Sequence, residues 1–200
     1  YNGVSFVIGA RRRIGFRYHF QTWQNLPFLN HVVLAEDTRL HCVEENLRWA
    51  AHLLETTPDR LPDDLVFQTP PAAEAAAAEF LAAHGLRRGA PLIAVHASCH
   101  TLKNQQNRCW PPASFAELLR RLADRLPGAQ CFLLEGPSDA AVTEAICRIV
   151  PTVPVARKLP MPVVRALIGQ CDLFVGNLSG LMHIAAAART PTVAVYGPTN

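Results

Sequence analysis

From residue 91 onward, short apolar runs alternate with segments whose apolar residues recur at helical spacing. The apolar run at 91–96 precedes a helical pattern over 112–126, and the run at 130–134 precedes another over 139–150. The alternation continues through 153–155, 163–170, 172–175, 180–188 and 192–196. Strands joined by crossover helices of this length form a parallel sheet that is covered on both faces. We therefore predict a Rossmann-like, doubly wound α/β domain over 91–200.

The first part of the chain has a less regular pattern. Its candidate elements are short strands at 14–18 and 31–35, helices at 40–54 and 69–85, and apolar runs of undecided type at 4–8 and 65–67. The helix at 69–85 begins with prolines and ends with Gly85, as helix termini prefer. The basic, turn-rich stretch at 86–90 is the expected linker between a domain over 1–85 and the domain over 91–200.

Composition excludes several classes of protein. The net charge is only +3, and Arg11, Arg12 and Arg13 form the single cationic cluster, so a broad surface for nucleic acid is not expected. No apolar run approaches the roughly 18 residues of a membrane span. The six cysteines form no C-x-x-C pair and lie mostly in apolar segments, so we expect free thiols and a reducing cytosol. Because the chain opens at Tyr1 without methionine and stops at Asn200 after a strand pattern, we expect it to lack both ends.

The segment 174–187 (F-V-G-N-L-S-G-L-M-H-I-A-A-A) is the strongest candidate site. A strand runs into a glycine-bracketed turn and then a helix, so backbone N–H groups and the positive helix end point to one place. This arrangement predicts an anion site at Ser179 and Gly180, with His183 bracing the loop or facing the ligand. The alternative is an ordinary glycine-cornered turn with a core histidine.

The loop over 96–111 is longer than most connections between a strand and a helix, and such loops are often functional. Lys103 or Arg108 can neutralise a phosphate from this loop. The alternative is a solvated excursion with Trp110 as an apolar plug. The spacing of its cysteines and His100 fits no zinc pattern, so no metal site is expected.

Two further loops follow predicted strands. In L-L-E-G-P-S-D (133–139), Ser138 and Asp139 are ordinary N-cap residues, and capping is the favoured role. In V-Y-G-P-T-N (195–200), Thr199 can donate a hydrogen bond to a phosphate, although an ordinary turn has the same sequence.

Taken in order, these loops resemble the bacterial heptosyltransferases of glycosyltransferase family 9, which move heptose from ADP-heptose onto lipopolysaccharide core. The matching stretches are R-I-G-F (13–16), H-C-V-E-E-N-L (41–47), H-A-S (96–98) with R-C-W-P (108–111), L-E-G-P-S-D (134–139), G-N-L-S-G-L-M-H-I-A-A-A (176–187) and Y-G-P-T (196–199). The resemblance implies a GT-B fold with two Rossmann-like domains. Residues 1–85 then form the C-terminal part of the acceptor-side domain, and 91–200 form a truncated donor-binding domain.

The resemblance also implies a set of donor-binding residues. Arg108 takes the place of a lysine that contacts the donor phosphate, and Met161 lies where an apolar wall packs on adenine. Ser179, Gly180 and Thr199 fall where the family cradles the pyrophosphate, while His183 supports the loop. The full expected donor-binding set is Ser98, Arg108, Met161, Leu178, Ser179, Gly180, His183 and Thr199.

The chain departs from the family pattern at two positions. Leu178 occupies the position of an acid near the sugar, and Ser98 lies where a glycine is common. The resemblance places the catalytic base in an N-terminal loop upstream of Tyr1. The expected function is transfer of a sugar from an ADP-sugar substrate to a lipid-linked saccharide at the inner face of the bacterial cytoplasmic membrane, without metal or cofactor. The alternatives are a non-catalytic nucleotide-binding module, suggested by Leu178, and a transferase that uses another nucleotide sugar on a protein or capsule.

Overall fold

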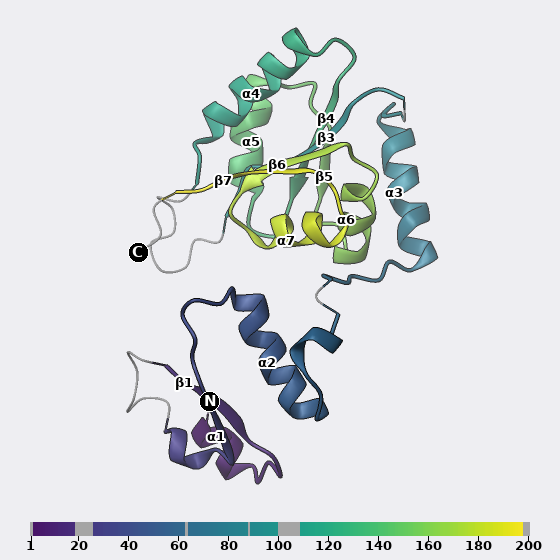
Figure 1. The fold of residues 1–200 in the computed structure, drawn as a ribbon. Helices are drawn as coiled ribbons and strands as arrows, with labels where there is room; N and C mark the ends of the chain where they lie inside the picture. Colours follow the sequence, from purple (N-terminus) through teal and green to yellow (C-terminus); the bar gives the residue numbers. More distant parts are fainter. Residues whose placement is uncertain (1, 19–25, 63, 88, 100–108, 198–200) are drawn as a thin grey trace. The chain divides into compact units, whose positions relative to one another are not determined.

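The computed structural model describes residues 2–18, 26–62, 64–87, 89–99 and 109–197 (Figure 1). The chain forms two compact units, Tyr1–Asp64 and Leu65–Asn200. Each unit has a parallel sheet of its own.

The described part of the first unit contains two short strands and several helices. Strands β1 (Ile14–Arg17) and β2 (Val32–Ala35) pair in parallel, which confirms the strands predicted there. The helical elements are α1 (Asn2–Val7), η1 (Pro27–Leu29), α2 (Cys42–Leu54) and η2 (Pro58–Arg60). Helix α2 begins with a capping box, in which His41 accepts from the N–H of Val43 and Glu44 accepts from the N–H of His41. The apolar run at 4–8, left undecided from sequence, lies mostly in α1.

The second unit is built on a five-stranded parallel sheet with the order β5-β4-β3-β6-β7. Its strands are β3 (Leu92–His96), β4 (Gln130–Glu135), β5 (Val155–Arg157), β6 (Leu173–Asn177) and β7 (Thr192–Val195). Its helices are α3 (Pro71–Ala83), α4 (Pro112–Arg125), α5 (Ala140–Ile149), α6 (Met161–Ile168) and α7 (Gly180–Ala187). The predicted doubly wound α/β architecture is confirmed.

Helices cover both faces of this sheet (Figure 1). Helices α4 and α5 pack on one face around Val95, Phe115 and Ile146, and helices α3, α6 and α7 pack on the other around Phe132 and Phe174. All five side chains are fully or almost fully buried. Every residue of β3 is buried, as expected for the central strand of a sheet that is covered on both faces.

The division between the units lies earlier than the linker expected at 86–90. It falls between Asp64 and Leu65, because α3 packs against α6 and belongs to the second unit. Ala73 and Ala77 on α3 are buried in this contact, and their small side chains let the two helices approach closely. The ring centroid of Phe80 lies 5.6 Å from that of Phe132 in β4, which further fixes α3 to the sheet.

Candidate functional site

A cavity of about 500 Å³ opens at the carboxyl ends of β3, β4 and β6. The connection after β3 leads to α4 on one face of the sheet, and the connection after β6 leads to α7 on the other. Neighbouring strands whose connections diverge in this way create the crevice in which open α/β sheets bind ligands. The described lining residues are His96, Ser98, Cys99, Leu134, Glu135, Gly136, Pro137, Ser138, Asp139, Leu159, Met161, Val164, Ser179, Gly180, Leu181 and Ile184.

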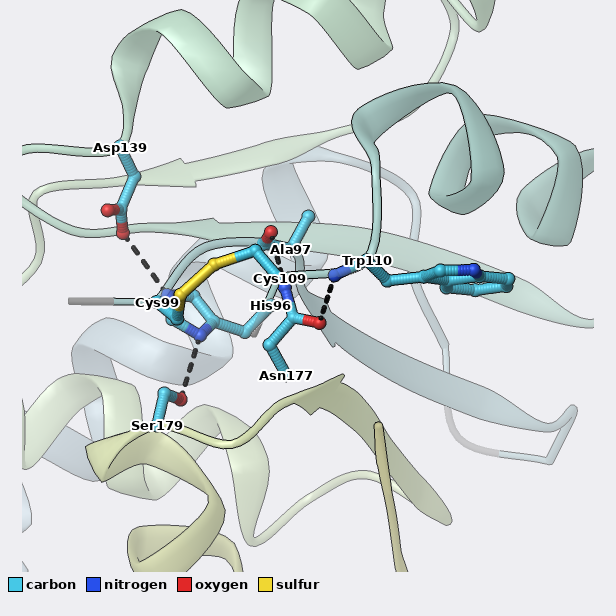
Figure 2. Close-up of a disulfide and its surroundings, with 8 residues drawn as sticks. All are labelled: His96, Ala97, Cys99, Cys109, Trp110, Asp139, Asn177 and Ser179. Carbon is cyan, nitrogen blue, oxygen red and sulfur yellow. Dashed lines mark hydrogen bonds and ion pairs between the residues drawn. A yellow bond between two sulfur atoms is a disulfide. The ribbon is translucent and has the colours of Figure 1, made fainter. Parts of the chain in front are cut away.

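His96 joins three segments at the polar side of this cavity (Figure 2). It is the last residue of β3, and its side chain is almost fully buried. Its Nε2 lies 3.1 Å from Oδ2 of Asp139, which follows β4, and its Nδ1 lies 3.1 Å from Oγ of Ser179, which follows β6. The ring therefore connects the β4–α5 loop to the first residue before α7.

Asp139 is held as a carboxylate by several donors. The hydrogen bond from His96 lowers the pKa of Asp139 most, while burial raises it. Hydrogen bonds from the Ser98 side chain and the Gly136 N–H, the latter 2.8 Å long, lower it further, so that the pKa falls from 3.8 to about 2. Asp139 stands at the N-cap position of α5, but its side chain makes no capping bond. The capping role predicted for Asp139 is therefore wrong, because its carboxylate is engaged by His96 and Gly136.

Asn177 fastens the base of the loop between β3 and α4. Its Nδ2 donates to the Ala97 carbonyl at 2.8 Å, and its Oδ1 accepts from the Trp110 N–H at 2.9 Å (Figure 2). The side chain is fully buried at the end of β6. One amide therefore holds both ends of the loop against the neighbouring strand.

A disulfide joins Cys99 to Cys109 beside this amide, with the two Cα atoms 6.1 Å apart (Figure 2). The prediction that these two cysteines are free thiols is therefore wrong. Asn177 bonds to both Ala97 and Trp110, which brings the nearby Cys99 and Cys109 together. The remaining cysteines, Cys42, Cys131, Cys147 and Cys171, are free.

The other side of the cavity is apolar. Leu134 and Val164 are buried in the wall, and Met161, the first residue of α6, is 46% exposed. Glu135 also lines the cavity, but its carboxylate is paired with Arg157 on the adjacent strand β5. An apolar wall facing a few convergent polar groups is typical of pockets for small organic ligands.

A family model described as glycosyltransferase family 9 (heptosyltransferase) matches residues 3–200. The chain belongs to glycosyltransferase family 9. Among curated proteins, the lipopolysaccharide heptosyltransferase 3 of Escherichia coli is 35% identical over 98 residues. The matched region covers 46% of this chain and 28% of that protein.

Two solved structures of glycosyltransferases share the fold. The family 9 glycosyl transferase from Veillonella parvula DSM 2008 matches with a TM-score of 0.77 at 22% identity, covering 100% of this chain and 54% of that one. The Escherichia coli heptosyltransferase WaaC with ADP-2-deoxy-2-fluoro heptose matches with a TM-score of 0.62 at 24% identity, covering 87% of this chain and 50% of that one. The chain thus spans about half the length of these two proteins. The predicted GT-B type fold, with Rossmann-like α/β units, is confirmed.

Four of the residues expected to bind the donor in this family 9 chain line the cavity: Ser98, Met161, Ser179 and Gly180. Leu178 and His183 are not among the described lining residues, and the side chain of His183 is exposed. Arg108 and Thr199, together with Lys103 and His100, lie outside the described residues. The donor-binding roles of all eight residues stay predictions.

Sequence reasoning did not single out His96 or assign a site role to Asp139. Both follow the carboxyl ends of strands, which was the available signal. The two residues are 43 positions apart, and His96 is 83 positions from Ser179, so their contact depends on the order of the strands.

Within the described residues, no group of three or more potential ligands is placed to hold a metal ion. The same residues contain no helix that is long and apolar enough to cross a membrane.

Proposed function

We propose that this chain binds the donor ADP-heptose in the cavity at the carboxyl ends of β3, β4 and β6 and contributes to the transfer of heptose onto lipopolysaccharide core. The observation that carries the proposal is the cavity itself. In this family 9 chain, it lies at the crevice where the connections after β3 and β6 lead to opposite faces of the sheet. The residues Leu65–Asn200 would then form the donor side, and Tyr1–Asp64 would belong to the acceptor side.

The two sides of the cavity suit the two parts of the donor. Met161 and Leu134 offer an apolar surface on which an adenine ring can pack. On the polar side, Ser179 is the N-cap of α7 and Gly180 is its first residue, and the N-terminus of a helix favours a negatively charged group. The geometry therefore supports a base against α6 and a diphosphate against α7.

The leaving group of such a transfer is ADP, on which negative charge develops as the sugar leaves. Fixed donors at the start of α7 can stabilise that charge in place of a divalent ion. We propose that no metal is needed, in keeping with the lack of a D-x-D motif in the sequence. The acceptor, a lipid-linked saccharide reached at the inner face of the cytoplasmic membrane, is part of the same proposal.

Calorimetric titration of the chain with ADP and with adenosine tests the binding step. ADP should bind more tightly than adenosine, because only ADP carries the diphosphate, and EDTA should leave both affinities unchanged. Equal affinity for the two ligands would contradict a diphosphate site at α7, and a loss of ADP binding in EDTA would contradict the metal-free proposal.

A second candidate, a nucleotide-binding module without turnover, is favoured by Leu178, which stands where the family pattern has an acid. Incubation of the full-length protein with ADP-heptose and a heptose-deficient lipopolysaccharide core separates the two candidates. Release of ADP together with a mass gain of one heptose on the acceptor supports the transferase. Tight ADP-heptose binding without ADP release supports the module.

A further inference from the structure

His96 lies between an ionised acid and the hydroxyl that faces the proposed diphosphate. We propose that binding of a nucleoside diphosphate in this cavity is coupled to uptake of a proton by His96, which reverses the hydrogen bond between His96 and Ser179. The inference rests on the proposed function, and it adds a proton linkage that neither the family nor the fold implies.

Asp139 determines which ring nitrogen of neutral His96 carries the proton. The pKa of Asp139 is lowered to about 2, so its carboxylate is ionised at neutral pH and can only accept hydrogen bonds. The contact at 3.1 Å between Asp139 Oδ2 and His96 Nε2 therefore requires a proton on Nε2. In a neutral imidazole the other nitrogen is then an acceptor. Asp139 thus fixes Nδ1 of His96 as the acceptor nitrogen.

The hydroxyl of Ser179 contacts the other ring nitrogen of His96. Its Oγ lies 3.1 Å from Nδ1 of His96. Because that nitrogen is an acceptor in the neutral ring, the Ser179 hydroxyl must donate its one proton to it. The oxygen then presents only lone pairs to the cavity, and these repel the oxygens of a phosphate. With neutral His96, Ser179 is a poor partner for the very ligand that the start of α7 attracts.

Protonation of His96 removes this conflict. In the imidazolium both nitrogens are donors, so Nδ1–H donates to Ser179 Oγ, and the Ser179 proton becomes free to point at an anion. One proton moves from solvent to Nδ1, no covalent bond between heavy atoms changes, and the hydroxyl turns from acceptor to donor toward the cavity. Histidine is suited to this change, because it is the side chain that ordinarily titrates between about pH 5 and 8.

Charge in the cavity favours the same change. Among the described lining residues, the titratable groups besides His96 are Glu135 and Asp139, since Cys99 is in a disulfide. Glu135 is neutralised by Arg157 of β5, which leaves the negative charge of Asp139 facing an incoming diphosphate. Protonated His96 offsets that charge through its direct contact with Asp139.

Helices α6 and α7, which pack on this face of the sheet, each carry one ionisable side chain. Arg165 of α6 lies 3.7 Å from Glu74 of α3, and His183 of α7 has an exposed side chain. Neither residue is among those that line the cavity. Among the described groups that line the cavity, the anionic ligand therefore acts most directly on His96.

Calorimetry of ADP binding to the full chain, in two buffers of equal pH and ionic strength but different ionisation enthalpy, measures the linked protons. At pH 7.5 we expect net proton uptake with ADP and none with adenosine, which lacks the phosphates. We also expect ADP affinity to fall by up to about tenfold per pH unit between pH 7 and 9. Equal heats in both buffers, or proton release, would overturn the inference.

His96→Gln, which cannot titrate, should bind ADP without proton uptake and with affinity that depends little on pH. Proton exchange by ADP itself occurs with both proteins, so the difference between the unaltered chain and His96→Gln gives the uptake by His96. The matched control is His84→Gln, which removes an exposed histidine at the C-cap of α3, outside the residues that line the cavity, and should keep the full uptake. Uptake that persists in His96→Gln would overturn the assignment of the proton to His96.

If His96→Gln does not fold, as judged by circular dichroism, the comparison of ADP with adenosine on the unaltered chain still accepts or rejects the linkage. If ADP does not bind the unaltered chain at all, the proposed function fails, and this inference fails with it. Binding without proton exchange overturns this inference alone.

Discussion

The fully buried amide of Asn177 accepts a hydrogen bond from the main-chain N–H of Trp110 at 2.9 Å, across 67 residues of sequence. The same amide donates to the Ala97 carbonyl, so both ends of the loop between β3 and α4 depend on one side chain. This arrangement places Ser98 and Cys99 in the wall of the cavity.

Asn177→Leu should therefore destabilise the second unit. The substitution keeps a side chain of similar size but leaves the Ala97 carbonyl and the Trp110 N–H without their partner, at a cost of about 2 kcal/mol or more. Urea denaturation followed by circular dichroism measures the change in the free energy of unfolding. Gln68→Ala removes an exposed amide and serves as the control, which should change stability little. Equal effects of the two substitutions would contradict the role assigned to Asn177.

The disulfide predicts a definite thiol count. In denaturant, the oxidised chain should show four reactive thiols, and the reduced chain should show all six cysteines. Denaturant is needed because burial raises the pKa of Cys131 to about 11 and that of Cys171 to about 12, which suppresses their native reactivity. Six thiols before any reductant is added would show that the bond does not form.

Loss of the disulfide should also lower stability. Replacing Cys99 and Cys109 together by serine removes a crosslink between residues ten positions apart, which by chain entropy stabilises by about 3 kcal/mol. The comparison is with Cys42→Ser, which changes an exposed free cysteine. A double variant as stable as Cys42→Ser would mean that Asn177 alone holds the loop base.

Two glycines of the segment 174–187 should respond in opposite ways. A Cβ added at Gly176 would lie 2.8 Å from the His96 carbonyl oxygen, so Gly176→Ala must push β6 away from β3 and should cost about 1–3 kcal/mol. A Cβ at Gly180 meets no atom within 4 Å. Gly180→Val should therefore fold normally, yet lose ADP binding, because the branched side chain blocks close approach of the phosphates. Thermal unfolding and calorimetry on both variants check the contrast, and unchanged ADP affinity in Gly180→Val would reject the phosphate site.

Protonation of the Asp139 carboxylate should lower the stability of the folded chain in acid. The pKa of Asp139 is lowered from 3.8 to about 2, so the folded state stabilises the ionised form of this side chain relative to the unfolded state. The resulting contribution of about 2 kcal/mol is present above pH 4 and is lost as the pH falls toward 2. Asp139→Asn should flatten this part of the stability profile, measured by urea denaturation from pH 5 to 2. Asp124→Asn, which alters an exposed carboxylate on α4, is the matched control.

The strands and helices of the second unit could be predicted, because each has an apolar period of its own. The sequence could not show that α3 belongs to the second unit, because its alanine-rich face has the same pattern whether the helix packs on an earlier or a later element. The disulfide between Cys99 and Cys109 and the contact of His96 with Asp139 escaped prediction for a related reason. Both depend on where the chain returns after a loop or a crossover, which local spacing does not encode.

Substitution of Leu178 shows whether an acid before the start of α7 contributes to binding of the sugar. A leucine cannot accept a hydrogen bond from a sugar hydroxyl, so the unaltered chain should gain little affinity from the heptose of ADP-heptose compared with ADP. In the full-length protein, Leu178→Asp should increase transfer from ADP-heptose, or at least the affinity advantage of ADP-heptose over ADP. Its main-chain N–H bonds to the Val195 carbonyl at 3.1 Å, a contact that the substitution keeps, so the backbone of the turn should persist. Calorimetry with both ligands on both proteins gives the answer. A strong preference for ADP-heptose in the unaltered chain, weakened by the aspartate, would mean that Leu178 is part of a differently built sugar pocket and that no acid is needed there.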